Sequence, residues 1–363
     1  MALASARRVL YVEPVAPSFA GNLRRLIRGE RTGHWRAHLT RRGESLWSYK
    51  PPPRLPLTLD LARINQLGHA LVRPRLRRVL DQLGLTAPVV VAGWPPAAAW
   101  AGQLGESLLV YDCMDDFSAF PQPPRRRRLM RQWQELLGQR AALLTATSEP
   151  LAAGWVHRHP NVHLLPNGVS DAILTDTCTA RPPADMAGIP GPRLLYIGLI
   201  SSWLDDALLA QLACIHPEWS LVLVGPVEVA SRALRQLPNV HLLGERPHEA
   251  LPGYLAAADA CLIPFKISPL TTAVNPIKLY EYLAAGKPVV STDLPEVARY
   301  ADVCYVASSD RSFVRAAEEA LREPCDDARR ETRRRIASEN TWTRRAAEFG
   351  TLLAASAGAG SRR

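Results

Sequence analysis

The chain has 363 residues, 47% of them apolar, and a formal net charge of +10 at pH 7. This length exceeds what a single hydrophobic core usually serves, so we expect two domains in a soluble protein. Prolines interrupt the longest apolar tract, Ala87 to Ala101, which excludes it as a membrane-spanning helix. Arg7 and Arg8 lead directly into a strand-like run and not into a signal peptide, which predicts a cytoplasmic protein.

The positive charge is concentrated in the first part of the chain. Residues 1–150 carry a net charge of +11, whereas residues 151–363 carry −1. The arginines that produce the excess are Arg24, Arg25, Arg28, Arg31, Arg73, Arg75, Arg77, Arg78 and Arg125 to Arg128. Such a basic face would attract anionic headgroups at the inner face of a membrane. The alternative is a set of solvated charge runs, and nucleic acid is disfavoured because no nucleic-acid-binding motif accompanies the charge.

Cysteine and histidine spacing gives no metal site. The six cysteines are scattered without Cys-x-x-Cys spacing, and the nine histidines include no His-x-x-x-His pair. We therefore expect reduced thiols, no disulfide framework and no essential metal ion.

Short β-rich runs alternate with helical stretches along both halves of the chain, which is typical of parallel α/β sheets. In the first half the predicted strands are Val9 to Val12, Val89 to Ala92, Leu108 to Tyr111, Leu143 to Ala146 and Val162 to Leu165. In the second half they are Leu194 to Gly198, Leu221 to Gly225, Val240 to Leu243, Ala260 to Pro264, Val289 to Thr292 and Cys304 to Val306. A Pro-Asn-Gly turn at residues 166–168 separates the halves, giving predicted domains at 1–168 and 169–335 and a closing helix at 336–363.

The run from Asn275 to Glu296 joins a helix to a strand. Pro276 suits a first helical turn, Gly286 suits the position after the helix, and Ile277, Tyr280, Leu283 and Ala284 recur at the spacing of a face that packs on a sheet. The unpaired N–H groups of a helix N-terminus favour a diphosphate, and Lys278 would add a full positive charge. Glu281 could accept hydrogen bonds from ribose hydroxyls. The alternative is a solvated Lys278–Glu281 pair on a surface helix.

Other candidate residues follow predicted strands, where ligands of open α/β sheets bind. Gly198 would let a phosphate approach the backbone, and Asp205 or Asp206 could begin the next helix. Asp112, Asp115 and Asp116 follow a first-half strand, and burial with mutual repulsion would raise a pKa enough for one of them to accept a proton. Asp115 is the first candidate and Asp116 the second. The alternative is a helix N-cap with solvated acids.

The order of these segments resembles that of the GT-B glycosyltransferases, especially the group 1, family 4-like enzymes that build bacterial cell-surface polysaccharides. The segments are the Lys278 to Val290 run, Tyr111 to Phe117, Thr147 to Glu149 and Leu165 to Val169. The resemblance implies two Rossmann-like lobes with parallel sheets facing across a cleft, an acceptor lobe followed by a donor lobe, and a closing helix that crosses back to the first lobe. It also implies that Glu281 binds the nucleotide ribose, that Gly21 faces the donor phosphates and that Gly244 to Arg246 lies near the base.

Two features depart from that pattern. The first glutamate of the family's Glu-x7-Glu motif would fall at Ala273, so Asn275 becomes the candidate polar contact to the donor sugar. No Arg or Lys lies between Arg193 and Arg232, so we expect Lys278 and Lys266 to replace the usual diphosphate-binding pair.

The resemblance predicts a transferase that moves a sugar from a nucleotide-diphosphate sugar to a hydroxyl of a glycan or lipid-linked acceptor. We expect retention, no metal and no cofactor beyond the donor. Two alternatives remain open. A sugar-nucleotide epimerase of similar fold would need no acceptor, and a degenerate scaffold protein would fit the loss of the motif glutamate.

Overall fold

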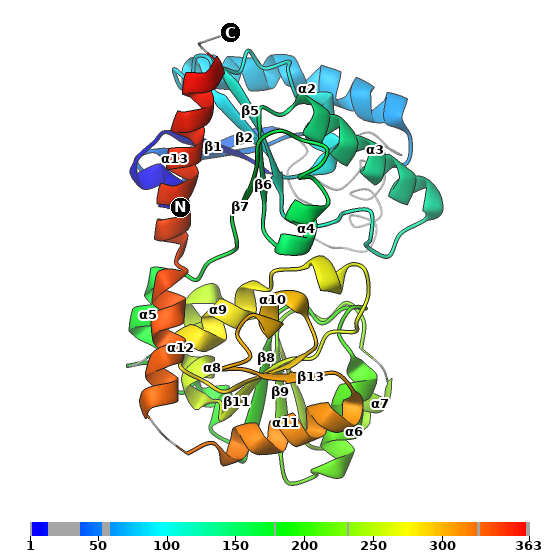
Figure 1. The fold of residues 1–363 in the computed structure, drawn as a ribbon, viewed down its shortest axis with the longest axis vertical. Helices are drawn as coiled ribbons and strands as arrows, with labels where there is room; N and C mark the ends of the chain where they lie inside the picture. Colours follow the sequence, from blue (N-terminus) through cyan, green and yellow to red (C-terminus); the bar gives the residue numbers. More distant parts are fainter. Residues whose placement is uncertain are drawn as a thin grey trace. The chain divides into compact units, whose positions relative to one another are not determined.

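The computed structural model describes residues 2–13, 37–52, 59–177, 179–230, 232–324 and 327–360. The chain forms two compact units, each of which is described by itself (Figure 1). Unit 1 contains the described residues of Met1–Thr147, Leu151–Leu165 and Ala346–Arg363, and unit 2 contains those of Ser148–Pro150 and Pro166–Arg345.

Unit 2 is built on one six-stranded sheet in the order β10-β9-β8-β11-β12-β13, with every pair parallel. The strands are β8 (Arg193–Ile197), β9 (Ser220–Val224), β10 (Val240–Gly244), β11 (Ala260–Ile263), β12 (Val289–Thr292) and β13 (Tyr305–Ala307). All residues of β9, β11 and β12 are buried, as expected for a parallel sheet covered by helices on both faces.

The helices of unit 2 connect these strands. They are α5 (Asp171–Asp176), α6 (Asp206–Ile215), α7 (Arg232–Gln236), α8 (Leu251–Ala257), α9 (Ile277–Ala284), α10 (Pro295–Ala298), α11 (Asp310–Arg322) and α12 (Asp327–Glu339), with short 3-10 turns at Ala184–Met186, His248–Ala250 and Thr271–Ala273. Asp205 is the N-cap of α6 and accepts a hydrogen bond from the Leu208 amide at 3.1 Å, which decides between the two predicted starts. All six strands predicted for this half are present.

Unit 1 contains two sheets. The parallel sheet β4-β5-β6-β7 comprises β4 (Val89–Ala92), β5 (Leu108–Cys113), β6 (Leu143–Ala146) and β7 (Val162–Leu164). The second sheet, in the order β1-β3-β2, comprises β1 (Val9–Val12), β2 (His38–Arg41) and β3 (Leu46–Lys50). The sequence did not predict β2 and β3, which pair antiparallel with each other. The α/β fold with parallel sheets is confirmed.

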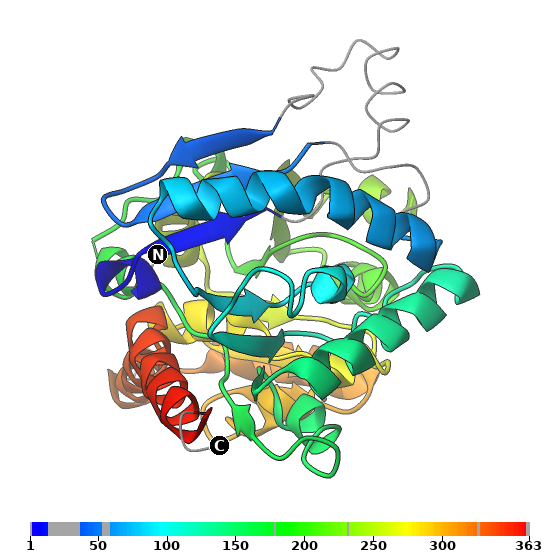
Figure 2. The ribbon, with the colours of Figure 1, turned by 90° about the horizontal axis from the view of Figure 1, so that it is seen from above.

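Three long helices pack on these sheets. They are α2 (Ala62–Gln82), α3 (Pro124–Arg140) and α13 (Trp342–Gly360), accompanied by the short elements Ala2–Ser5, η2 (Pro95–Ala99) and α4 (Glu149–Ala153). In Figure 2, α2 in light blue runs alongside the dark blue β1, and its Leu76 and Val79 share a buried cluster with Tyr49 of β3. On the other sheet, Phe349 and Leu353 of α13 pack against β5 and β6. Among the described helices, none combines the length and apolar character needed to cross a bilayer.

Candidate functional site

Three glycines occupy the carboxyl ends of neighbouring strands in unit 2. Gly198, Gly225 and Gly244 follow or end β8, β9 and β10, with φ values of +140°, +145° and +75°. The Gly198 amide donates to the Val224 carbonyl and the Gly225 amide to the Gly244 carbonyl, each at 2.9 Å. A Cβ at Gly225 would lie 2.0 Å from the Gly198 carbonyl oxygen. Only glycine fits there, so this sheet edge presents bare backbone, which we call the glycine edge.

Helix α9 begins beside the glycine edge. Pro276 is its N-cap, and the helix starts at Ile277, one residue later than predicted. At the other end Gly286, with φ +69°, donates to the Leu283 carbonyl and Lys287 to the Tyr282 carbonyl, the two bonds of a Schellman motif. The amide of Ile197 in β8 donates to the Tyr282 hydroxyl at 2.8 Å, which fixes α9 against the strand that ends at the glycine edge.

The face of α9 differs from the prediction at one position. Leu279, Tyr280 and Leu283 are buried, but Ile277 is 42% exposed, so the prediction that it packs on the sheet is wrong. Ile277 is the first residue of α9 and precedes the part of the helix that packs against the sheet.

Lys278 projects from the first turn of α9 to the glycine edge. A Cβ at Gly198 would lie 3.3 Å from Lys278 Cε, and Lys278 Nζ lies 4.6 Å from the centre of the Phe265 ring and 5.4 Å from that of Tyr196. Burial lowers the pKa of Lys278 to about 8, against the opposing effect of the Glu281 charge. No described carboxylate lies within 4.0 Å of the Lys278 ammonium. A half-buried cation without a paired anion is suited to bind one.

Glu281, one turn along α9, is 8% exposed, so the alternative of a solvated surface pair is wrong. Burial raises the pKa of Glu281, while the charges of Lys278 and then His248 lower it. No hydrogen bond from a described residue reaches its carboxylate, which leaves it able to accept from ligand hydroxyls. The structure therefore brings together Gly198, Lys278 and Glu281, as the sequence predicted.

Two further predicted donor residues, Lys266 and Arg246, have protein partners. Lys266 Nζ donates to the Ser202 carbonyl at 3.3 Å and lies 3.6 Å from Asp206. Arg246 donates to Asp185 and to the Tyr254 hydroxyl, which fixes the segment after Gly244. Gly21 lies outside the described residues. The predicted contacts of these three residues with a donor stay predictions.

Asn275 is 1% exposed and fully hydrogen-bonded. Its Oδ1 accepts from the Asn167 amide at 3.1 Å, and its Nδ2 donates to the Tyr280 hydroxyl at 3.1 Å and to Glu296 at 2.8 Å. These bonds hold the backbone just before α9 in place. They leave the Asn275 side chain no hydrogen bond to offer a sugar in this arrangement.

Glu296 is the buried centre of this network, and the sequence did not identify it. It is 2% exposed, it accepts from the Glu149 amide and from Asn275, each at 2.8 Å, and Arg299 lies 3.7 Å away. We call Asn167, Glu149, Asn275, Glu296 and Arg299 the α9 anchor. The only signal in the sequence was the position of Asn275 and Glu296 at the two ends of the motif.

The acidic cluster of unit 1 follows β5. Burial, and next the charge of Asp116, raise the pKa of Asp115 to about 6. Asp116 accepts from the amide and hydroxyl of Ser118 at 2.9 and 2.7 Å. The N-cap of α3 is Pro123, so neither Asp115 nor Asp116 caps that helix and the capping alternative is wrong. Asp115 has the properties of a proton acceptor near neutral pH.

The described residues contain no group of three His, Cys, Asp or Glu side chains arranged for a metal ion. Four cysteines are described, all as free thiols. Cys113, Cys261 and Cys304 are buried and Cys214 is exposed.

Comparisons with known proteins agree with this geometry. Residues 191–323, which contain the glycine edge and α9, match the family described as "Glycosyl transferases group 1". The chain is 31% identical over 257 residues to the "Putative teichuronic acid biosynthesis glycosyltransferase TuaH" of Bacillus subtilis (strain 168). That match covers 64% of this chain and 64% of the relative, so the chain spans less than two thirds of that protein.

Solved structures show the same fold at low identity. Sucrose-phosphate synthase from Thermosynechococcus elongatus matches with a TM-score of 0.69 and 16% identity, over 97% of this chain and 90% of the other. Anabaena HepE in complex with UDP and glucose matches with a TM-score of 0.62 and 15% identity, over 96% and 99% of the two chains. The UDP-forming trehalose-phosphate synthase of Burkholderia xenovorans gives 0.64 and 14%, over 96% and 98%.

Proposed function

We propose that this chain, a group 1 glycosyltransferase of the GT-B fold, transfers a sugar from a nucleotide-diphosphate sugar to a hydroxyl of a glycan or lipid-linked acceptor. The observation that carries the proposal is the half-buried Lys278 ammonium at the glycine edge, which has no carboxylate within 4.0 Å among the described residues. A diphosphate there would supply a directly paired anion, in addition to the more distant charge of Glu281.

Each donor group has a role in this proposal. The first turn of α9 and Lys278 stabilise the negative charge that develops on the leaving diphosphate. The bare backbone at Gly198 and Gly225 lets the phosphates approach closely. Glu281 accepts hydrogen bonds from the ribose hydroxyls, and the Gly244 to Arg246 segment lies where the base would bind.

In the transfer step, the acceptor oxygen bonds to the anomeric carbon as the bond from that carbon to the diphosphate oxygen breaks. The acceptor proton passes to a base, for which Asp115 is the first candidate and Asp116 the second. Retention at the anomeric carbon and independence of metal ions are parts of the proposal. A cell-surface glycan acceptor is supported by the name of the Bacillus relative, and membrane contact through the first-half arginines stays a prediction.

The test is thermal stabilisation of the full chain by a panel of nucleoside diphosphates and nucleotide-sugars. We expect a shift for one nucleotide that disappears in Glu281→Ala and persists in Glu319→Ala, an exposed glutamate on α11. No shift for any nucleotide would contradict the proposal and favour a scaffold protein. Turnover of the donor sugar to its epimer without acceptor would instead identify an epimerase.

A further inference from the structure

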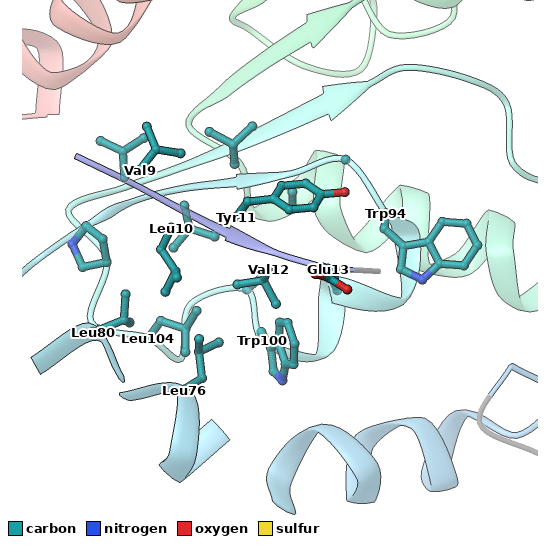
Figure 3. Close-up of a pocket in the computed structure, with 18 of the residues that line it drawn as sticks. Val9, Leu10, Tyr11, Val12, Glu13, Leu76, Leu80, Trp94, Trp100 and Leu104 are labelled. Carbon is teal, nitrogen blue, oxygen red and sulfur yellow. The ribbon is translucent and has the colours of Figure 1, made fainter. Parts of the chain in front are cut away.

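Unit 1 contains a cavity of about 930 Å³ between the strands β1 and β4. Val9 to Glu13 line it (Figure 3), and so do Val89 to Gly93. The two strands run in the same direction, because Arg8 at the start of β1 donates to the Leu83 and Gly84 carbonyls just before β4. No backbone hydrogen bond joins β1 to β4 in the described part of the chain.

Both strands therefore present open edges to the cavity. The Val9 amide donates to the Ser45 carbonyl just before β3 and the Glu13 amide to the Tyr49 carbonyl of β3, so the intervening Leu10 and Val12 direct their backbone groups to the other side. In the same way the Pro88 carbonyl accepts from Ser107, so Val89 and Val91 direct theirs away from β5. Unpaired backbone groups that line a cavity favour a ligand that can hydrogen-bond.

The cavity differs in chemistry along its length. Around Leu10 and Val12 its walls are apolar, formed by Leu76, Leu80, Leu104 and the Trp100 ring (Figure 3). At the carboxyl ends of β1 and β4 it is polar, with Glu13, Trp94 and Asp112. Two side chains of the lining, His69 and Trp94, have a buried ring nitrogen that no described residue hydrogen-bonds, and His69 is only 7% exposed.

The contrast between the apolar walls and the polar end of the cavity identifies the chemical class of the ligand. A wholly polar molecule would leave the leucine walls in contact with water, and a wholly apolar one would leave the buried ring nitrogens of His69 and Trp94 without a partner among the described residues. Glu13, whose Oε1 accepts from the Ser48 hydroxyl at 2.7 Å, lines the same cavity. An amphiphile satisfies both ends, and the volume is within the usual range for small-molecule pockets.

We propose that this cavity binds the acceptor as an amphiphile, with its hydroxyl-bearing head at Glu13 and Trp94 and its apolar chain along Leu10, Val12 and Leu76. Asp112 and Met114 line the same end, and Asp115 is the next residue, so the head lies beside the proposed base. The inference rests on the proposed function and adds the class of acceptor to it.

Binding of octyl β-glucoside below its micellar concentration, measured by calorimetry on the full chain without donor, tests the inference. Methyl β-glucoside supplies the head alone. We expect affinity to rise about tenfold for every two methylenes added to the chain. The matched variants are Leu71→Glu and Leu67→Glu, because the two side chains lie one turn apart on α2 and are 57% and 56% exposed, but only Leu71 lines the cavity. Leu71→Glu should weaken octyl glucoside binding at least tenfold and Leu67→Glu should not.

Two results would overturn the inference. One is affinity that does not depend on chain length or on Leu71. The other is strong hydrogen-exchange protection of the Val89 and Val91 amides without ligand, which would mean that β1 and β4 pair directly and the cavity is closed. Either result together with intact nucleotide stabilisation would reject only the acceptor cavity, whereas loss of nucleotide stabilisation would reject the proposed function itself.

Discussion

Replacing Glu296 by alanine should destabilise unit 2 and weaken donor binding, although we place Glu296 in no contact with the donor. Its carboxylate accepts from the Glu149 amide and from Asn275 Nδ2 at a site that is 2% exposed. Removing it leaves two buried donors unpaired, each at a cost of about 1–3 kcal/mol. The expected loss of unfolding free energy is therefore roughly 2–5 kcal/mol, the lower values applying if water enters the space.

Replacing Glu296 by glutamine removes the carboxylate charge but keeps the size and shape of the side chain. A glutamine oxygen can still accept from the Glu149 amide, but its NH₂ group would face the NH₂ group of Asn275. Asn275 cannot reverse its amide without losing the bond from the Asn167 amide. We therefore expect an intermediate loss of about 1–3 kcal/mol.

Urea denaturation and hydrogen exchange of the α9 amides measure these losses, with Glu319→Ala as the exposed control. Nucleotide titration at a temperature where each variant is folded should show weaker binding in the order wild type, Gln, Ala. If Glu296→Ala were as stable as the control and bound nucleotide normally, the α9 anchor would have no role in holding Lys278.

Three further predictions concern the site. Transfer should slow below about pH 6, because Asp115 must lose its proton to act as a base and burial raises its pKa to about 6. Asp115→Asn should remove that limb of the pH–rate profile, and a variant with an unchanged profile would exclude Asp115 as the base. The same substitution should stabilise unit 1 at pH 7 by roughly 1–3 kcal/mol, because the buried carboxylate charge costs free energy above the pKa of the unfolded state. Nucleotide affinity, measured by calorimetry, should fall above about pH 8, where Lys278 loses its proton. Lys278→Met should lose both the affinity and its dependence on pH. If the variant kept the pH dependence, another titrating group would be responsible for it. Gly225→Ala should destabilise unit 2 by more than about 3 kcal/mol, because its Cβ would meet the Gly198 carbonyl. Gly350→Ala on α13, with open space around it, should instead stabilise the protein by about 0.5–1 kcal/mol. Equal changes in Tm for the two variants would refute the steric argument.

The positions of Gly198 and Lys278 beside each other were predictable because their signals are local. Pro276, Gly286 and the β-branched strand after them define a helix and a strand whose order fixes where the helix begins. The carboxyl-edge rule for parallel sheets then places Gly198 beside that helix start, and the structure has Lys278 Cε next to Gly198.

The α9 anchor was not predictable because it joins residues far apart in sequence. Asn275 was interpreted as a contact for the donor sugar, since a polar residue before a helix can serve either a ligand or the protein. Its partners Asn167 and Glu296 lie 108 and 21 positions away, so no local pattern could choose between the two.

The hairpin of β2 and β3 was missed for another reason. His38 to Arg41 is short and largely polar, which hides the strand period.

The partners of buried charges distinguish structural from functional ionisable residues in this chain. Arg333 is 1% exposed and is held by both oxygens of Glu323 and by the Val303 carbonyl. Although burial alone would raise the pKa of Glu323, hydrogen bonds from Arg333 and Tyr305 hold it below its usual range, so this pair stays charged and stabilises the fold.

Lys278, Glu281 and Asp115 have the opposite character. Burial shifts the pKa of each towards the neutral form, and none of them forms an ion pair within 4.0 Å with a described residue, although the charges of Lys278 and Glu281 partly oppose each other's shift. Selection for stability alone would replace such groups, because an unpaired buried charge costs free energy. Their cost is recovered only when a ligand supplies what the protein lacks: an anion for Lys278, hydroxyls for Glu281 and a proton for Asp115. These are the groups that a diphosphate, a ribose and an acceptor hydroxyl provide, which is why the three residues together argue for transfer and not for a scaffold.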